Sequence, residues 1–165
     1  MAGKTLWLLA GALIPAGALA QSAAEESDAR PVAQTIVTDP AALARLRGNS
    51  GITLQWINFT YPDERPRARR GHVAVADRGD TVHISGVQHA AEGDGYVSVT
   101  GDIAEIGSDY FIFDGRIVIS GAPDADRHCV KTGRSRFAIT QNRRYWRMRE
   151  FEWCDSLTDY IDIYF

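Results

Sequence analysis

Lysine and cysteine are both scarce in this chain of 165 residues. Only Lys4 and Lys131 are lysines, so arginine supplies the other 16 of the 18 basic residues. A net charge of −3 argues against a general binder of nucleic acids or other polyanions. After the N-terminal region no apolar run approaches the roughly 20 residues that a membrane-spanning helix needs. We therefore expect no nucleic-acid partner and no transmembrane span in the mature chain.

The bulk composition is that of an ordinary globular protein. Hydrophobic residues make up 45% of the chain and charged residues 24%, which argues against wholesale disorder and against a fibrous or collagen-like structure. Once a removable N-terminal segment is subtracted, the remaining length suits a single domain.

Residues 1–20 have the three parts of a secretory signal peptide. Lys4 supplies the positive charge, residues 6–14 form a short apolar stretch, and Ala18-Leu19-Ala20 offers a small-x-small cleavage site. We expect cleavage before Gln21, and no cysteine follows that site to accept a lipid. The expected localisation is therefore periplasmic or secreted.

Export determines how the two cysteines are interpreted. In an oxidising compartment Cys129 and Cys154 most simply form one disulfide, whereas a zinc site would need further ligands at a spacing that the chain does not offer. The bridge would close a loop of about 26 residues, worth about 3.5 kcal/mol in the chain-entropy model.

The pattern after the signal peptide predicts an all-β fold. Residues 21–37 are expected to be a flexible lead-in and residues 38–165 a single domain, beginning with a short helix that Asp39 caps and Gly48 ends. From Gly51 onward apolar residues recur at every second position between turn signals, which predicts about eight to nine short strands. Because such a meander must protect its edges, we expect a small antiparallel β-barrel, or a closed meander or sandwich, with one disulfide.

Two hairpins are predicted within this meander. A turn at residues 77–80 would place Val73, Val75, Val82 and Ile84 on one face, which we assign to the core. Asp114-Gly115 is the strongest turn signal in the chain and predicts a second hairpin with apolar residues on both faces. Its rings, Phe111 and Phe113, are expected to be core residues.

Catalytic and metal-binding patterns are weak. His72, His83 and His89 share one face of the first hairpin, but the diagonal separation of neighbouring strands, about 7–8 Å, is long for shared ligation. Residues 124–126 lack the further acidic positions of a calcium loop, and Ser50 is not in a nucleophile-elbow pattern. We therefore predict no catalytic, cofactor-binding or metal-binding residues.

Two arginine-rich segments could form a binding surface. One is a loop between prolines, and the other interleaves arginines with aromatic residues, a pattern that can bind anions. The predicted binding surface consists of Arg65, Arg67, Arg69, Arg70, Trp146, Arg147 and Arg149.

These observations favour an exported, soluble β-barrel protein without catalytic activity that acts as a binding or interaction module of the cell envelope. Its partner would be a small apolar ligand or an envelope protein. One alternative is a small outer-membrane β-barrel, although strands of five to eight residues are short for a membrane. The other alternative is a small periplasmic hydrolase.

Overall fold

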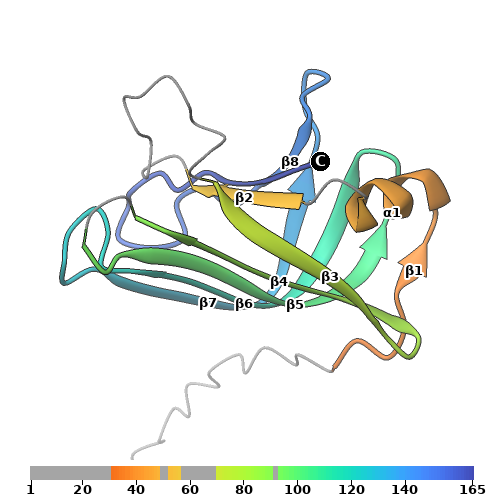
Figure 1. Ribbon diagram of the computed structural model, residues 1–165, viewed down its shortest axis with the longest axis horizontal. Helices are drawn as coiled ribbons and strands as arrows, with labels where there is room; N and C mark the ends of the chain where they lie inside the picture. The colour runs from red at the N-terminus through yellow and green to blue at the C-terminus, as the bar shows by residue number, and fades with distance from the viewer. Residues whose placement is uncertain (1–30, 49–51, 57–69, 91–92) are drawn as a thin grey trace, which may run out of the picture.

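The computed structural model describes residues 31–48, 70–90 and 93–165, and in addition the backbone of residues 52–56 (Figure 1). One short helix and nine strands are formed within these residues. In chain order they are β1 (Ile36–Val37), α1 (Pro40–Arg47), β2 (Ile52–Trp56), β3 (Gly71–Arg78), β4 (Thr81–His89), β5 (Tyr96–Ile106), β6 (Tyr110–Ser120), β7 (His128–Ala138), β8 (Tyr145–Met148) and β9 (Ile161–Tyr164).

The sheet is antiparallel apart from β1, and it is strongly curled. Each strand from β2 to β9 pairs with the next one in sequence, and β9 pairs back with β2. The long strands β3 to β7 form a half-barrel, and the shorter strands β8, β9 and β2 connect its two sides (Figure 1). The connection to β7 is brief, because β8 pairs only with Phe137 and Ala138. The expected mostly-β fold, with one short N-terminal helix and one disulfide, is confirmed.

The first predicted hairpin is confirmed, with a shorter turn. β3 and β4 pair out to Arg78 and Thr81, which leaves a two-residue turn whose Gly79 has a φ of 62°. The side chains of β3 and β4 share the expected faces, because shortening an even-length turn by two residues shifts the pairing by an even number of positions. Val82 and Ile84 are buried accordingly.

The second predicted hairpin is wrong, because β6 runs without interruption through Asp114 and Gly115. Gly115 pairs with Gly101 of β5 on one side and with Gly133 of β7 on the other. β5, β6 and β7 each have 11 residues, which is longer than the expected five to eight. A continuous β6 places Phe111, Phe113, Ile117 and Ile119 on the same inner face, and all are buried.

Aromatic side chains fill the interior at the end of the half-barrel where β8 closes it. The rings of Phe111 and Phe137 stack with centroids 4.9 Å apart, and Phe113 meets Phe137 edge-on at 6.1 Å. Trp146 packs against Phe111 at 5.6 Å and against Phe165 at 4.3 Å. This part of the interior is therefore a packed core rather than a ligand cavity.

The predicted helix is confirmed as α1. The Asp39 side chain accepts a hydrogen bond of 2.8 Å from the Ala41 N–H, and the Gly48 N–H donates to the Ala44 carbonyl at the other end. Ala42 and Leu46 are fully buried, and the helix also lies against β3. Strand β1 precedes the helix and lies within residues 21–37, the range expected to be a flexible lead-in. There β1 pairs in parallel with β5, and the buried Thr35 hydroxyl donates to the Ile103 carbonyl.

The outward-facing positions of the long strands are mostly polar. On β5 they include Ser98, Thr100 and Asp102, and on β7 they include Thr132 and Arg134. No helix in the described part of the chain has the length and apolar character needed to cross a membrane.

Candidate binding surface

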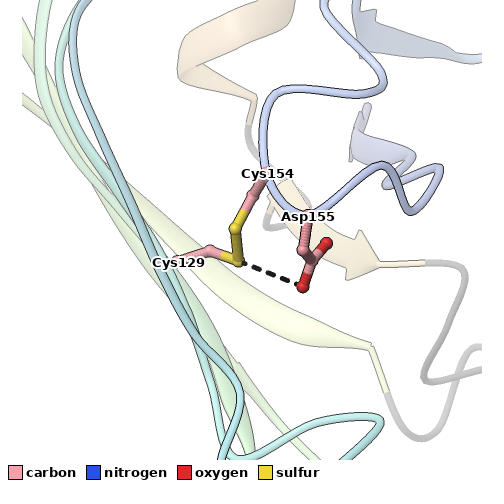
Figure 2. A group of neighbouring side chains, drawn as sticks. All are labelled: Cys129, Cys154 and Asp155. Carbon is pink, nitrogen blue, oxygen red and sulfur yellow. Dashed lines mark hydrogen bonds between the residues drawn. A yellow bond between two sulfur atoms is a disulfide. The ribbon is translucent and has the colours of Figure 1, made fainter.

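The predicted disulfide between Cys129 and Cys154 is confirmed, with the two Cα atoms 6.0 Å apart. It ties the inner face of β7 to the segment that connects β8 and β9 (Figure 2). Because that segment contains no regular secondary structure between Phe151 and Tyr160, the covalent link restricts a part of the chain that has few backbone hydrogen bonds of its own.

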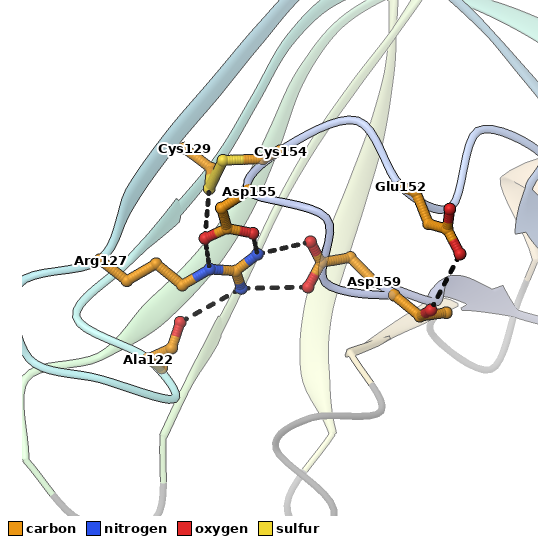
Figure 3. Close-up of polar contacts among 8 residues, drawn as sticks. Ala122, Arg127, Cys129, Glu152, Cys154, Asp155 and Asp159 are labelled. Atoms are coloured by element: carbon orange, nitrogen blue, oxygen red, sulfur yellow. Dashed lines mark hydrogen bonds and ion pairs between the residues drawn. A yellow bond between two sulfur atoms is a disulfide. The ribbon is translucent and has the colours of Figure 1, made fainter.

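Arg127 secures the same segment through two carboxylates (Figure 3). Its Nε and Nη2 donate to Asp155 at 2.7 and 2.9 Å, and its Nη1 and Nη2 donate to Asp159 at 3.1 and 2.7 Å. Asp159 is fully buried, so its charge is compensated by the guanidinium rather than by water. Hydrogen bonds from Arg127 lower the pKa of Asp155. This arrangement attaches the segment between β8 and β9 to the start of β7.

Cys129, Cys154 and Asp155 form the only group of three potential metal ligands within the described residues. The Sγ of Cys129 lies 3.9 Å from Oδ2 of Asp155 (Figure 2). Metals bind the thiolate form of cysteine, and both sulfur atoms are already joined in the disulfide. The group therefore does not fit a metal ion.

A second arginine–aspartate pair lies on the outer face of β8 and β9. Arg147 and Asp162 are directly opposite each other in the ladder, and Nε and Nη2 of Arg147 donate to the two carboxylate oxygens at 2.7 and 2.8 Å. Asp162 is fully buried and the Arg147 side chain is only 12% exposed. A bidentate pair of this kind fixes the plane of the guanidinium.

Three tyrosines surround this ion pair and remain partly exposed. The Arg147 guanidinium lies 4.2 Å from the Tyr160 ring centroid and 5.1 Å from that of Tyr145. Tyr145 pairs with Tyr164 across the ladder, with ring centroids 4.8 Å apart, and the Arg70 guanidinium lies 3.4 Å from the Tyr164 centroid. We call Arg70, Tyr145, Arg147, Tyr160 and Tyr164 the tyrosine–arginine face.

At this face, burial and the neighbouring positive charge shift the pKa of Asp162 in opposite directions. Burial raises the pKa of Asp162 despite the hydrogen bonds and positive charge of Arg147. Burial also raises the pKa of Tyr164, and the bonds to Asp162 raise the pKa of Arg147. Arg143 donates a hydrogen bond of 2.6 Å to the Tyr145 hydroxyl, which adds a further cation beside the rings. The face is therefore positive and aromatic, with its central arginine held in place.

The structure brings together only part of the predicted binding surface. Arg70 and Arg147 both belong to the tyrosine–arginine face, whereas Arg149 lies over the Phe151 ring, 4.9 Å from its centroid. Trp146 points into the core and is fully buried, so its assignment to an exposed surface is corrected. The remaining predicted residues lie outside the described residues: Arg65, Arg67 and Arg69.

The histidines of the first hairpin have different surroundings. His72 and His89 are exposed, whereas His83 is 9% exposed and its Nδ1 lies 2.7 Å from Oδ1 of Asp102. The Thr100 hydroxyl is 3.5 Å from the other ring nitrogen of His83. These groups lie on the outer face of β4 and β5, and Ser50 lies outside the described residues.

Sequence reasoning missed Tyr160, Asp162 and Tyr164, although a signal for them exists. Residues 160–165 alternate strictly, and assigning Ile161 and Ile163 to the core places these three polar residues together on the opposite face. No comparable signal exists for Arg127 and its two carboxylates, because the partners are 28 and 32 residues away along the chain.

Comparisons with known proteins place the chain in a family but attach no activity to it. The model of the PM1083 family matches residues 34–165. A protein of Pasteurella multocida (strain Pm70), named "Uncharacterized protein PM1083", is 33% identical over 124 residues, covering 73% of this chain and 74% of the relative. No solved structure matches the chain.

Proposed function

The chain belongs to the PM1083 family, and we propose that it is an exported, soluble and non-catalytic binding module of the cell envelope. Its signal peptide would be removed before Gln21, and its partner would be an envelope protein that contacts the tyrosine–arginine face. The packed core around Phe111 and Phe113 favours such a partner over a small apolar ligand, because a ligand of that kind needs an internal cavity.

The tyrosine–arginine face is the observation on which this proposal rests. Tyrosine and arginine are, with tryptophan, the residue types enriched at the energetically important positions of protein interfaces. Here the rings are partly exposed while the central guanidinium is fixed by Asp162, so little side-chain entropy remains to be lost on binding. A rigid aromatic surface of this kind is suited to recognition.

The distribution of polarity supports a soluble protein over an outer-membrane barrel. A membrane barrel has an apolar outer band and a polar interior. This half-barrel has the opposite arrangement, with Phe111, Ile117 and Phe137 inside and residues such as Thr100 and Arg134 outside. Strand length does not separate the two classes, since the 11-residue strands β5, β6 and β7 are long enough to cross a membrane.

The ion pairs support a non-catalytic role. Both buried carboxylates, Asp159 and Asp162, are held by arginines, which remain protonated at any physiological pH. The His83–Asp102 pair lies on the outer face of β4 and β5, away from the packed interior, and the Thr100 hydroxyl is 3.5 Å from the other ring nitrogen of His83, which is longer than a well-formed hydrogen bond. A hydrolase normally needs an activated nucleophile in an enclosed, water-poor site.

Site-specific photo-crosslinking in living cells tests the proposal. A photoreactive amino acid would replace Tyr160 in the full chain, and a matched chain would carry it at Ser85, which is exposed on the outer face of β4. We expect a discrete adduct with an envelope protein from position 160 and none from position 85. Adding Tyr145→Ala should lower the yield of the adduct several-fold, whereas His72→Ala should not change it.

Three results would contradict the proposal. One is an identical set of adducts from positions 160 and 85, which would indicate non-specific contact. Another is the absence of any adduct from position 160 when the protein is abundant. The third is recovery of the protein in the cytoplasm with residues 1–20 still attached.

A further inference from the structure

Arg143 lies beside the tyrosine–arginine face and has no acidic partner there. Its Nη1 donates to the Tyr145 hydroxyl at 2.6 Å, and its Nη2 donates to the side-chain oxygen of Gln141 at 2.8 Å. Both acceptors are neutral, and no carboxylate in the described part of the chain forms an ion pair with Arg143. The residues that the structure describes therefore leave the charge of this guanidinium uncompensated.

Arg147 keeps part of its guanidinium available for a further acceptor. Its bonds to Asp162 use Nε and Nη2, so the hydrogens on Nη1 have no acceptor among the described residues. The Tyr145 hydroxyl accepts a bond from Arg143, and its own hydrogen has no acceptor within the same residues. Because Asp162 fixes the plane of the Arg147 guanidinium, the Nη1 hydrogens have a defined direction before a partner binds.

These donors are arranged around one aromatic ring. The Cζ atom of Arg143 lies 5.7 Å from the centroid of the Tyr145 ring, and that of Arg147 lies 5.1 Å from it. Guanidinium N–H groups and a phenol O–H all donate to carboxylate oxygens, and bonds with an ionised acceptor are stronger than those with a neutral one. The surroundings of Tyr145 are therefore suited to an additional carboxylate.

The local charge also favours an acidic ligand. Arg143 and Arg147 both act on the charge of Asp162, whose two oxygens accept from Arg147 and which is fully buried. Two positive charges thus share one carboxylate, in a chain whose net charge is −3. Near Arg149 there is no such excess, because residues 150–152 include two glutamates. Partners whose charges are complementary recognise each other more specifically and associate faster.

We propose that the tyrosine–arginine face binds an acidic segment of its partner protein, with an aspartate or glutamate carboxylate held by Arg143 and Arg147 beside the Tyr145 ring. This inference rests on the function proposed above, since it specifies the chemistry of the same partner. The carboxylate supplies the charge that Arg143 lacks, and it accepts from the Nη1 hydrogens of Arg147.

Binding of two synthetic peptides to the purified protein is the first test. In one peptide aspartate alternates with glycine, in the other asparagine replaces aspartate, and both are capped at their ends. We expect the aspartate peptide to cause saturable NMR shifts at the Arg143 Nε–H and the Tyr145 ring, and the asparagine peptide to bind several-fold more weakly. Added salt should weaken binding of the aspartate peptide. Equal affinity for the two peptides, or no saturable shift, would overturn the proposal.

Two matched variants show whether Arg143 is responsible. Arg143→Gln should weaken binding of the aspartate peptide several-fold, whereas Arg116→Gln, which removes an exposed arginine from the outer face of β6, should not change it. The side chain of Arg143 bonds only to Tyr145 and Gln141 within the described residues, so its variant should keep the urea midpoint of the parent. Equal affinities of the two variants would refute recognition by Arg143.

The same two variants in the crosslinking experiment separate this inference from the proposed function. We expect Arg143→Gln to lower the yield of the adduct from position 160 several-fold and Arg116→Gln to leave it unchanged. An adduct that forms equally well in both variants would refute recognition of an acidic segment while leaving the binding module intact. The absence of any adduct from position 160 would contradict both proposals.

Discussion

Gly115 of β6 lies directly opposite Gly101 of β5, and the Phe113 ring covers both residues. A Cβ atom on Gly115 would lie 2.5 Å from the Cα of Gly101 and 2.6 Å from the Phe113 ring. The absence of side chains at this pair is therefore what admits the ring onto the inner surface of the sheet. Covering strand glycines with an aromatic ring is a known way to stabilise a curved sheet.

Gly115→Ala should therefore destabilise the protein although alanine is itself a small residue. The added methyl group meets backbone and a buried ring rather than the end of a flexible side chain, so the neighbours must move. Overpacking of this kind costs about 1–3 kcal/mol. Urea denaturation measures the change in the free energy of unfolding. The neighbouring variant Arg116→Ala is the control, since Arg116 is exposed and its loss should change stability by less than about 0.5 kcal/mol. Equal stability of the two variants would contradict the packing argument.

The Gly101–Gly115 pair illustrates which parts of the fold the sequence predicts and which it does not. Patterns that act within a few residues, such as the Asp39 cap, the period-two face with Val82 and Ile84, and the cysteine pair, are confirmed. Asp114-Gly115 was interpreted by its local turn propensity, but the register of three strands assigns it to the middle of β6. Local signals cannot reveal a glycine whose role is to make room for a ring.

The sequence likewise predicts only some of the residues of the candidate site. Arg70 and Arg147 were predicted from composition, and strict alternation in residues 160–165 could have added the tyrosines of β9. Trp146 alternates with Arg147 along β8, so it points into the core while the arginine points out. The contacts of Arg127 join residues distant in sequence, so only the three-dimensional structure identifies them.

The mature protein should begin at Gln21 and contain no free thiol. Both cysteines are joined in the disulfide, so a thiol reagent should add no mass under denaturing conditions unless a reductant is present. Intact-mass spectrometry of protein purified from its native cells measures both properties. Uptake of the reagent without reduction would contradict the disulfide, and a mass that includes residues 1–20 would contradict cleavage.

Arg127→Met should lower the free energy of unfolding by about 3–5 kcal/mol, because it removes the guanidinium that holds the fully buried Asp159 carboxylate. The double variant Arg127→Met with Asp159→Leu should recover a large part of that loss, since it removes the buried carboxylate as well. A double-mutant cycle by urea denaturation gives the coupling. If the two losses simply add, Arg127 and Asp159 do not act as a pair.

Asp155 should make stability depend on pH at the acidic end. Its pKa is lowered in the folded protein by hydrogen bonds from Arg127, so the unfolded chain takes up the proton first as the pH falls below about 4. The stabilisation from Asp155 is thus complete at neutral pH and is lost as the pH falls through the lowered pKa. Asp155→Asn should be less stable than the parent at neutral pH and should approach it in acid. A difference in urea midpoint that stays constant with pH would refute this linkage.

Phe113→Ala tests the burial of the ring that lies over the glycine pair. The ring is fully buried and meets Phe137 at 6.1 Å, so its removal leaves a cavity on the inner face of β5 and β6 that the backbone of their two paired glycines cannot refill. Deleting a buried aromatic side chain costs about 3–5 kcal/mol. Val130→Ala is the matched control, because Val130 is 43% exposed on the outer face of the neighbouring strand and its truncation should be nearly neutral. Urea denaturation should show a lower midpoint for Phe113→Ala at an unchanged slope, which is the sign of lost stability rather than of a changed unfolded state. A midpoint equal to that of the parent would contradict burial of the ring, and it would make Phe111 and Phe113 part of an exposed binding face.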